Sequence, residues 1–195
     1  MNDIVIVENA LPEESCDFLS KFCEKYPQAF VNPFQTIEAF KDRTVAYKNI
    51  RGATETPYNT VSSVLNYSRF LGQREINTFY QDHCFPENTE LTIWRQGQDM
   101  SPHADNCWQP DVDEEIKKTK HPTRFRSYSG IFYLNDTFIG GDIYFVNLNY
   151  RLKPKKGMFV GFKAGLEHTH QVLPIESGNR YTIAIWYSNM IEYVE

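Results

Sequence analysis

The sequence predicts a mostly β domain, with helices in the N-terminal half of the chain and an antiparallel jelly roll in the C-terminal half. Two patterns predict this class. Apolar residues recur at helical spacing only before residue 87, and short β-prone runs between turn residues fill the chain from residue 90 onward. Because no helical pattern separates these runs, an antiparallel sandwich is favoured over a parallel sheet with crossover helices.

Residues 1–86 are expected to supply one strand and two supporting helices. Ile4–Val7 is an apolar run typical of a short strand, and Pro12-Glu13-Glu14 marks the acidic start of a helix. The apolar stripe of that helix has a helical period, so we interpret it as core packing. A second helix is predicted between Tyr58 and Tyr80, interrupted near Gly72, with an apolar face formed by Val61, Val64, Leu65, Tyr67, Phe70 and Leu71.

Residues 87–195 are expected to form the jelly-roll core. The predicted strands share β-branched and aromatic residues between turn residues, and they are Leu91–Trp94, Tyr128–Leu134, Asp142–Val146, Met158–Phe162, Gln171–Ile175 and Tyr181–Tyr187. A chain of 195 residues with 41% apolar and 15% aromatic content has the size of one compact domain. We therefore expect residues 1–195 to form a single domain.

A long polar segment, residues 106–126, interrupts the β-rich part of the chain. It contains a run of acidic residues followed by a run of lysines. Loops of this length inside a domain are usually functional lids or disordered segments. Its charge fits a solvated surface excursion equally well, but its position directly after His103-Ala104-Asp105 favours a lid.

Charge and cysteine content limit the classes of partner. Twenty basic and 25 acidic residues give a net charge of -5, which disfavours nucleic acid and anionic membranes as partners. No apolar run approaches the ~20 residues of a membrane span. The scattered Cys16, Cys23, Cys84 and Cys107, without an export signal at the N-terminus, predict reduced thiols and a cytoplasmic protein. The oligomeric state has no signal in the sequence.

His103 and Asp105 form the first candidate for metal chemistry. In an extended strand, residues two apart project from the same face, so one ion could meet both side chains. A third ligand must come from elsewhere in the chain, and the candidates are His83, His121, His168 and His170. Two histidines and one carboxylate form the facial triad of non-haem Fe(II) oxygenases. Alone, the pair is a weak signal for a metal site, because a histidine beside an aspartate is usually a hydrogen-bonded surface pair.

Three further motifs follow this pair in a fixed order. They are Phe132-Tyr133-Leu134-Asn135, Gly140-Gly141-Asp142, and a C-terminal segment in which Pro174, Gly178 and Arg180 follow His170. Over residues 91–187 this pattern resembles the 2-oxoglutarate/Fe(II) oxygenases, and within them the prolyl 4-hydroxylase-like group. The resemblance implies a double-stranded β-helix, the cupin-like form of the jelly roll, as the fold of the C-terminal part.

The resemblance also implies the ligand set, His103, Asp105 and His170. His170 is favoured over His168 because Pro174 and Gly178 follow it at the family spacing. His168 stays open as a residue beside the site, as a substrate-facing residue or as the ligand itself. We interpret His83 and His121 as structural or surface residues, since neither has a partner at ligand spacing.

Four residues are expected to bind the co-substrate. A guanidinium forks onto a carboxylate, and Arg180 stands where the resemblance places the residue that captures the far carboxylate of 2-oxoglutarate. Tyr133 matches the tyrosine that joins it. Trp94 replaces a pocket tyrosine of many relatives, and Trp186 shares a strand face with Arg180. The alternatives are an exposed strand arginine in a surface ion pair and a core strand tyrosine.

The resemblance implies that Fe(II), 2-oxoglutarate and O₂ serve as cofactor and co-substrates, with ascorbate as a reductant, in hydroxylating an unactivated C–H bond. The carboxylate of Asp105 favours hydroxylation, because relatives with a small residue there halogenate. The predicted substrate is a prolyl residue of a peptide or protein, hydroxylated at C4.

Three other functions compete with this prediction. One is an oxygenase acting on a small molecule or free amino acid. Another is AlkB-type nucleic-acid repair, which the net charge and Trp186, in place of a second arginine, disfavour. The third is a non-catalytic, cupin-like metal-binding module, which would not need Arg180 and Tyr133 as a carboxylate grip.

Overall fold

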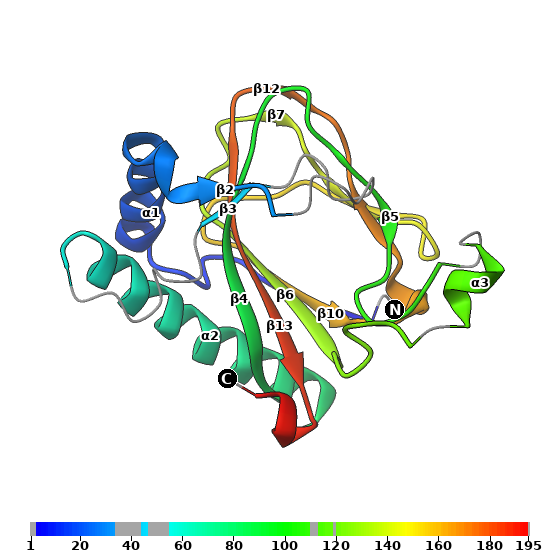
Figure 1. Cartoon of the computed structure of the whole chain (residues 1–195). Coiled ribbons are helices and arrows are strands. Elements are labelled where there is room, and N and C mark those ends of the chain that lie inside the picture. The colour runs from blue at the N-terminus through cyan, green and yellow to red at the C-terminus, as the bar shows by residue number, and fades with distance from the viewer. Residues whose placement is uncertain (1–2, 34–43, 47–54, 110–112, 119, 195) are drawn as a thin grey trace.

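Two β-sheets packed face to face form the body of this protein, and helices cover the outer face of the larger sheet (Figure 1). The structure is a computed structural model, and it describes residues 3–33, 44–46, 55–109, 113–118 and 120–194. This architecture is the sandwich of a double-stranded β-helix, so the predicted fold class is confirmed. None of the described helices is long and apolar enough to cross a membrane.

The larger sheet has seven strands in the order β1-β10-β6-β13-β4-β3-β2. Their bounds are β1 Ile4–Val7, β2 Phe30–Val31, β3 Thr44–Ala46, β4 Phe85–Trp94, β6 Tyr128–Tyr133, β10 Phe159–Lys163 and β13 Arg180–Ser188. The smaller sheet has the order β5-β11-β8-β9, with β5 Met100–His103, β8 Ile143–Phe145, β9 Tyr150–Leu152 and β11 His170–Val172. A separate pair joins β7, Ile139–Gly140, to β12, Ile175–Ser177. All pairings described are antiparallel, as predicted.

The α-helices within the described residues are α1 Glu13–Lys25, α2 Tyr58–Tyr80 and α3 Glu114–Lys117. Short 3-10 turns lie at Pro27–Ala29, Leu166–His168 and Ile191–Tyr193. The buried residues of α1 are Cys16, Leu19, Phe22 and Cys23, all from the predicted apolar stripe, and Phe18, which the prediction also included, is partly buried against the same core. Helices α1 and α2 pack their buried residues against one face of the larger sheet. The other face of that sheet packs against the smaller sheet (Figure 1).

Helix α2 corrects two expectations. It runs unbroken through Gly72, where an interruption was predicted. The glycine allows close packing instead: a Cβ at this position would collide with the Tyr187 hydroxyl and the Phe159 ring. The apolar face is as predicted only in part. Val61, Leu65 and Leu71 are buried and Val64 packs against the same core, but Tyr67 and Phe70 are 52% and 64% exposed, and the buried face continues to Ile76.

The predicted strand Gln171–Ile175 is wrong in its extent. The chain forms β11 and β12 instead, and the two strands pair in different sheets. Pro174 lies between them and has no backbone N–H to donate to a continuous ladder. The break turns the chain from the smaller sheet, which holds His170, towards the start of β13, which holds Arg180.

Three apolar clusters of described residues hold the layers together. The first joins the helices to the outer face of the larger sheet, the second fills the space between the sheets with residues of β6, β8 and β10, and the third packs Trp94 of β4 with Met100, Val172 and Ile175. The second cluster includes Ile143, Phe145, Val160 and Phe162, all nearly inaccessible to solvent. It ends beside the pocket, so the site lies between rigid sheets.

Gly72→Ala is predicted to destabilise the protein, against the usual effect of this change in a helix. Alanine normally stabilises a helix by ~1 kcal/mol over glycine. Here the new methyl group would displace the fully buried Tyr187 side chain, whose hydroxyl donates to the Arg69 carbonyl at 3.4 Å. We expect a net loss of about 1–3 kcal/mol in the free energy of unfolding, measured by urea denaturation.

Ser63→Ala, at an exposed position of the same helix, is the matched control. It should leave stability unchanged or raise it by about 0.5 kcal/mol through helix propensity. Equal stabilisation by both changes would contradict the close packing of α2 on the sheet.

Candidate metal centre

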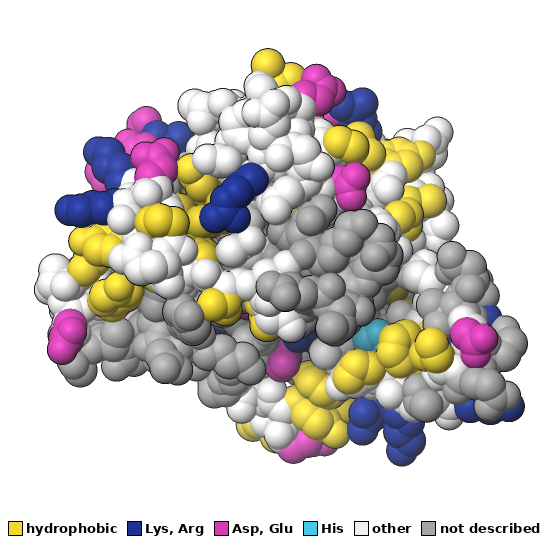
Figure 2. Space-filling view, turned by 45° about the horizontal axis from the view of Figure 1, so that its top comes forward, with side chains coloured by type: hydrophobic (Ala, Val, Ile, Leu, Met, Phe, Trp, Pro, Cys, Tyr) yellow, Lys and Arg dark blue, Asp and Glu magenta, His cyan; other side chains and the backbone are white. Residues whose placement is uncertain are grey.

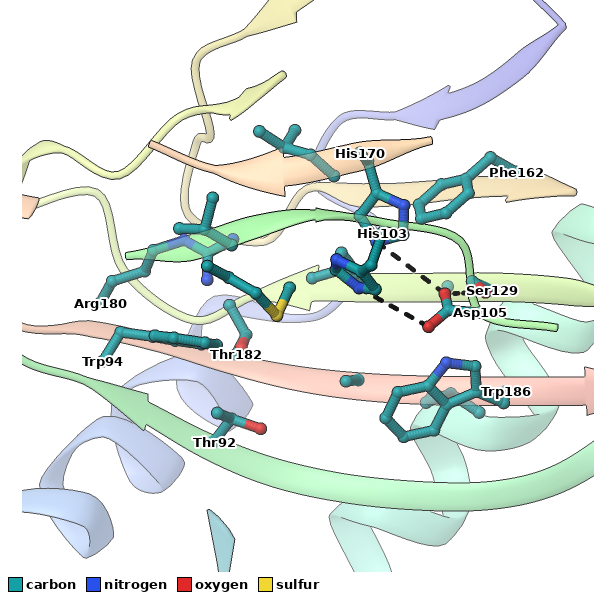
Figure 3. Close-up of a pocket in the computed structure, with 17 residues that line it drawn as sticks. Thr92, Trp94, His103, Asp105, Ser129, Phe162, His170, Arg180, Thr182 and Trp186 are labelled. Atoms are coloured by element: carbon teal, nitrogen blue, oxygen red, sulfur yellow. Dashed lines mark hydrogen bonds and ion pairs between the residues drawn. The ribbon is translucent and has the colours of Figure 1, made fainter. Parts of the chain in front are cut away.

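His103 and His170 are brought together by the pairing of two strands. His103 ends β5, His170 begins β11, and the two residues are direct register partners. Their rings lie 4.3 Å apart between centroids. Asp105 completes the group, with Oδ1 at 3.8 Å from His103 Nε2 and Oδ2 at 3.9 Å from His170 Nε2 (Figure 3). One ligand atom from each of the three buried residues lies within 4.8 Å of the others.

Backbone carbonyls orient both imidazoles. His103 Nδ1 donates to the Ser101 carbonyl at 3.0 Å, and His170 Nδ1 donates to the His168 carbonyl at 3.0 Å. Each Nδ1 therefore carries the proton, and each Nε2 presents its lone pair to the centre of the group. Asp105 is fixed as well: Ser129 Oγ donates to its Oδ2 at 2.6 Å, and Thr123 Oγ1 donates to its main-chain carbonyl at 2.6 Å.

Burial and neighbouring groups set the protonation of His170 and Asp105. Desolvation, with His103 close by, lowers the pKa of His170 to about 3, so its imidazole is neutral at pH 7. Burial alone would raise the pKa of Asp105, but the two histidines, Arg126 and the Ser129 hydroxyl outweigh it and hold that pKa below its ordinary value. A neutral imidazole and an ionised carboxylate are the forms that bind metal.

The donor set fits a divalent transition metal. Two imidazoles and one carboxylate on one side of a pocket can occupy one face of an ion and leave the opposite face open. Among the described residues, this is the one group of three or more such side chains close enough to hold a metal together.

His168 takes a different place. Its side chain is buried, and Nε2 lies 2.8 Å from the Asp3 carbonyl, so it ties the N-terminal segment to the sheet. It is not part of the group above. His83 is exposed, and His121 accepts the Thr123 backbone N–H at 3.3 Å. Of the histidines considered, the structure brings only His170 to His103 and Asp105.

A pocket between the two sheets opens beside these residues, lined by both polar and aromatic side chains (Figure 3). Trp94 lies across from Arg180 in the β4–β13 ladder, at the end of the pocket away from Asp105. Trp186 lies at the other end, near Asp105 and Ser129, so the two tryptophans do not share one role. In Figure 2 a histidine is visible in a hollow of the surface beside a row of hydrophobic side chains.

Arg180 is 1% exposed and is not the surface arginine of the alternative interpretation. Its guanidinium carbon lies 5.0 Å from the centre of the Tyr133 ring. Arg180 and Tyr133 interact with each other and with the charge of Asp142, but Arg180 Nε and Nη2 and the Tyr133 hydroxyl are buried without a hydrogen bond of regular geometry among the described residues. A buried cation with unsatisfied donors is costly on its own, so this pair fits a ligand that brings a carboxylate.

The base of the polar segment 106–126 is closed by contacts on both sides. Asn106 Nδ2 donates to the Arg126 carbonyl at 2.9 Å. The Arg126 side chain pairs with Glu87 at 2.9 Å and lies 4.2 Å above the Trp186 ring. Helix α3 forms within the segment, of which residues 110–112 and 119 lie outside the described residues. The segment thus contacts the metal centre through its base.

Ser129 and Arg126 were not expected from the sequence. Ser129 lies four residues before Tyr133 on β6, and strand alternation puts both on the inner face. That spacing could have placed Ser129 on the inner face, but not in contact with Asp105. Arg126 has no comparable signal, because its contact with Trp186 joins a loop to a strand sixty residues later.

Residues 89–188 match the model of the 2OG-Fe(II) oxygenase superfamily. The chain is 38% identical over 99 residues to human prolyl 3-hydroxylase 3 and 34% identical over 110 residues to human prolyl 3-hydroxylase 1. These matches cover 48% and 54% of this chain but only 13% and 15% of the relatives. The chain therefore corresponds to a small part of each relative's length.

Solved structures share the fold. A viral collagen prolyl hydroxylase from Paramecium bursaria Chlorella virus-1, in a 2OG complex, superposes with a TM-score of 0.64 at 18% identity, covering 96% of both chains. A Pseudomonas putida prolyl-4-hydroxylase gives 0.66 at 17% identity, covering 96% of this chain and 92% of the other. A prolyl hydroxylase from Trichoplax adhaerens, in complex with a peptide fragment of hypoxia inducible factor, gives 0.67 at 17% identity, covering 97% and 84%.

The family match begins within β4, ends with β13, and spans just over half of the 195 residues. It includes the whole group of His103, Asp105 and His170 and the buried Arg180. The resemblance inferred from the sequence is confirmed: this chain belongs to the 2OG-Fe(II) oxygenase superfamily.

Proposed function

We propose that this chain hydroxylates a prolyl residue of a peptide or protein, using Fe(II), 2-oxoglutarate and O₂. The observation that carries the proposal is one buried pocket with a metal-binding group at one end and an unsatisfied guanidinium at the other. A pure metal store or a cupin-like binding module has no use for the second feature. The named prolyl hydroxylases among the sequence relatives and similar structures support the substrate class.

His103, Asp105 and His170 hold the metal in this proposal, with His168 in a supporting position. When bound, the Fe(II) centre couples decarboxylation of 2-oxoglutarate to succinate and CO₂ with insertion of one oxygen atom of O₂ into a C–H bond. The residues around it orient the reactants and keep water away. Each imidazole is held by a backbone carbonyl, so its ring does not need to reorient on binding.

Arg180 and Tyr133 bind the far carboxylate of 2-oxoglutarate in this proposal. The guanidinium provides two unsatisfied N–H directions and the phenol a third donor, which suits a carboxylate that accepts on both oxygens. Trp94 forms the wall beside Arg180, and Trp186 forms the wall beside Asp105 rather than beside the co-substrate carboxylate. Both rings exclude water from the pocket.

We propose that residues 106–126 act as a lid over a peptide. The segment is anchored at its base by Asn106 and Arg126, and the anchored end contacts Trp186 inside the pocket. A peptide under the lid would therefore lie close to the metal centre. Nucleic acid is a poorer fit, because the net charge is -5 and the pocket offers Trp186 where a repair enzyme of this type has an arginine.

The remaining assignments stay proposals. We propose that residues 1–195 form one domain, because α1 and α2 share a core cluster with β6, β10 and β13. A reducing compartment such as the cytoplasm is supported by four free thiols, three of them buried, with burial raising the pKa of the Cys16 thiol to about 11. Ascorbate as reductant and hydroxylation at C4 stay predictions; the relatives carry the names of both 3- and 4-hydroxylases.

His103→Ala is predicted to abolish succinate formation. The substitution removes one of three buried ligands and leaves the Asp105 carboxylate facing a single imidazole. Succinate release from 2-oxoglutarate, measured on protein loaded with Fe(II) under anaerobic conditions and then exposed to O₂, should fall to background. A chelator should do the same to the unmodified protein, and added Fe(II) should reverse it. His83→Ala, at an exposed histidine, should keep full activity.

Arg180→Gln is predicted to weaken 2-oxoglutarate binding by at least ~30-fold while leaving metal affinity within a factor of about two. Loss of one partner from a buried charge-assisted pair costs about 2–5 kcal/mol. Calorimetric titration of Mn(II) into the metal-free protein measures the metal affinity, and titration of 2-oxoglutarate into the Mn(II)-loaded protein without O₂ measures the co-substrate affinity. Arg74→Gln is the matched control, because Arg74 is an arginine of α2 whose side chain is 68% exposed and pairs with Glu75. Similar effects of both changes would contradict the assigned role of Arg180.

Proline-containing peptides are predicted to stimulate succinate release and to gain one hydroxyl group. Amino-acid analysis that separates 3- from 4-hydroxyproline identifies the carbon, and omission of ascorbate tests its role. Stimulation only by free amino acids or other small molecules, with no hydroxyproline formed, would remove the peptide substrate and leave the oxygenase assignment in place.

A further inference from the structure

The two oxygens of the Asp105 carboxylate have different surroundings. Oδ2 accepts the Ser129 hydroxyl at 2.6 Å and lies 3.9 Å from His170 Nε2, whereas Oδ1 lies 3.8 Å from His103 Nε2. Both partners of the hydrogen bond are buried, Ser129 to 3% exposure and Asp105 to 9%. A short hydrogen bond to an ionised oxygen in a buried site is strong, so this contact restricts rotation of the carboxylate.

Ser129 is itself rigidly placed. It lies on β6, which is paired on both sides, opposite Phe162 of β10 and Trp186 of β13. Register partners in neighbouring strands project to the same face, and both of these partners line the pocket with Ser129 (Figure 3). The backbone of Ser129 is therefore fixed, and a single torsion angle, χ1, sets the position of the hydroxyl oxygen that contacts Asp105.

The number of oxygens that Asp105 offers decides how much of the site stays open. A carboxylate can bind a metal through one oxygen or through both. With one oxygen, the three protein side chains occupy one face of an octahedral ion and leave the opposite face for co-substrate and O₂. With both, a fourth protein atom occupies a position that the co-substrate or O₂ requires.

We propose that Ser129 keeps Asp105 a one-oxygen ligand and so reserves a coordination position for 2-oxoglutarate. The inference rests on the proposed metal ligands. The hydroxyl draws electron density from Oδ2 and holds the carboxylate plane, so Oδ1 is the better donor. Ser129 is thus a positioning residue: it acts on the co-substrate through Asp105.

This role differs measurably from simple support of a ligand. If Ser129 only orients Asp105, its removal should lower the metal affinity by about 10–100-fold. If Ser129 prevents two-oxygen binding, its removal should leave the metal affinity unchanged or higher and lower the affinity for 2-oxoglutarate instead. The ratio of the two affinities therefore separates the roles.

The test measures Mn(II) affinity and then 2-oxoglutarate affinity of the Mn(II)-loaded protein, both by calorimetry without O₂. In Ser129→Ala we expect Mn(II) affinity to stay equal or rise and 2-oxoglutarate affinity to fall about tenfold. Ser129→Thr keeps a hydroxyl and should restore co-substrate affinity. Ser129→Cys, whose thiol is similar in size but a weak donor, should change both affinities in the same direction as Ser129→Ala. It replaces the alanine variant in the test if that variant does not fold.

Ser127→Ala is the matched control. It removes the hydroxyl of a serine two residues earlier in the chain, which donates to the Asn189 side chain at 2.9 Å and not to Asp105. Its 2-oxoglutarate affinity should stay within a factor of about two of the unmodified protein. An equal loss in Ser127→Ala and Ser129→Ala would overturn the proposal.

The remaining outcomes are also decisive. Weaker Mn(II) binding with unchanged 2-oxoglutarate affinity in Ser129→Ala would mean that Ser129 only orients the metal ligand Asp105. This result would overturn the inference but not the proposed function. Failure of the unmodified protein to bind Mn(II) or 2-oxoglutarate would overturn the proposed function, and the inference with it.

Discussion

The register between β5 and β11 places His103 opposite His170, and the rest of the site depends on this pairing. Side chains of paired residues in neighbouring antiparallel strands project to the same face, so two histidines 67 positions apart meet as neighbours. A slip of one residue would turn one imidazole to the opposite face of the sheet. β8 pairs with the other edge of β11 and the Asp105 N–H donates to the Ala164 carbonyl at 2.9 Å, so the register is supported from both sides.

A second ladder places the other half of the pocket. β13 lies between β4 and β6, opposite Trp94 at one end and Ser129 at the other. This single strand therefore carries Arg180 and Trp186 to opposite ends of the same cavity. Because β13 and β11 are each paired on both sides, the distance between the guanidinium and the metal-binding group is set by the packing of the two sheets and not by a loop.

Burial gives these groups their chemistry. In a pocket closed by Trp94, Trp186 and Phe162, charges interact more strongly than in water, and a charge without a partner is costly. Arg180 carries unsatisfied donors, whereas Asp105 is surrounded by two imidazoles and the Ser129 hydroxyl. Arg180 thus needs a ligand to satisfy its donors, whereas the neighbours of Asp105 already orient its carboxylate. This difference is expected of a pocket that binds a diacid at one end and a metal at the other.

Much of this could be predicted from the sequence, because helical and strand periodicity and short motifs are local properties. The α1 stripe, the antiparallel sandwich and the residues of the metal group and carboxylate grip follow from spacing along the chain and from resemblance. The tertiary structure decided what depends on distant neighbours. Helix α2 continues through Gly72, which packs closely against Tyr187. Pro174 divides one predicted strand between two sheets, and the His168 side chain contacts the Asp3 carbonyl. Ser129 reaches Asp105 only because β6 lies beside the chain that follows β5, a contact between sheets that no local pattern contains.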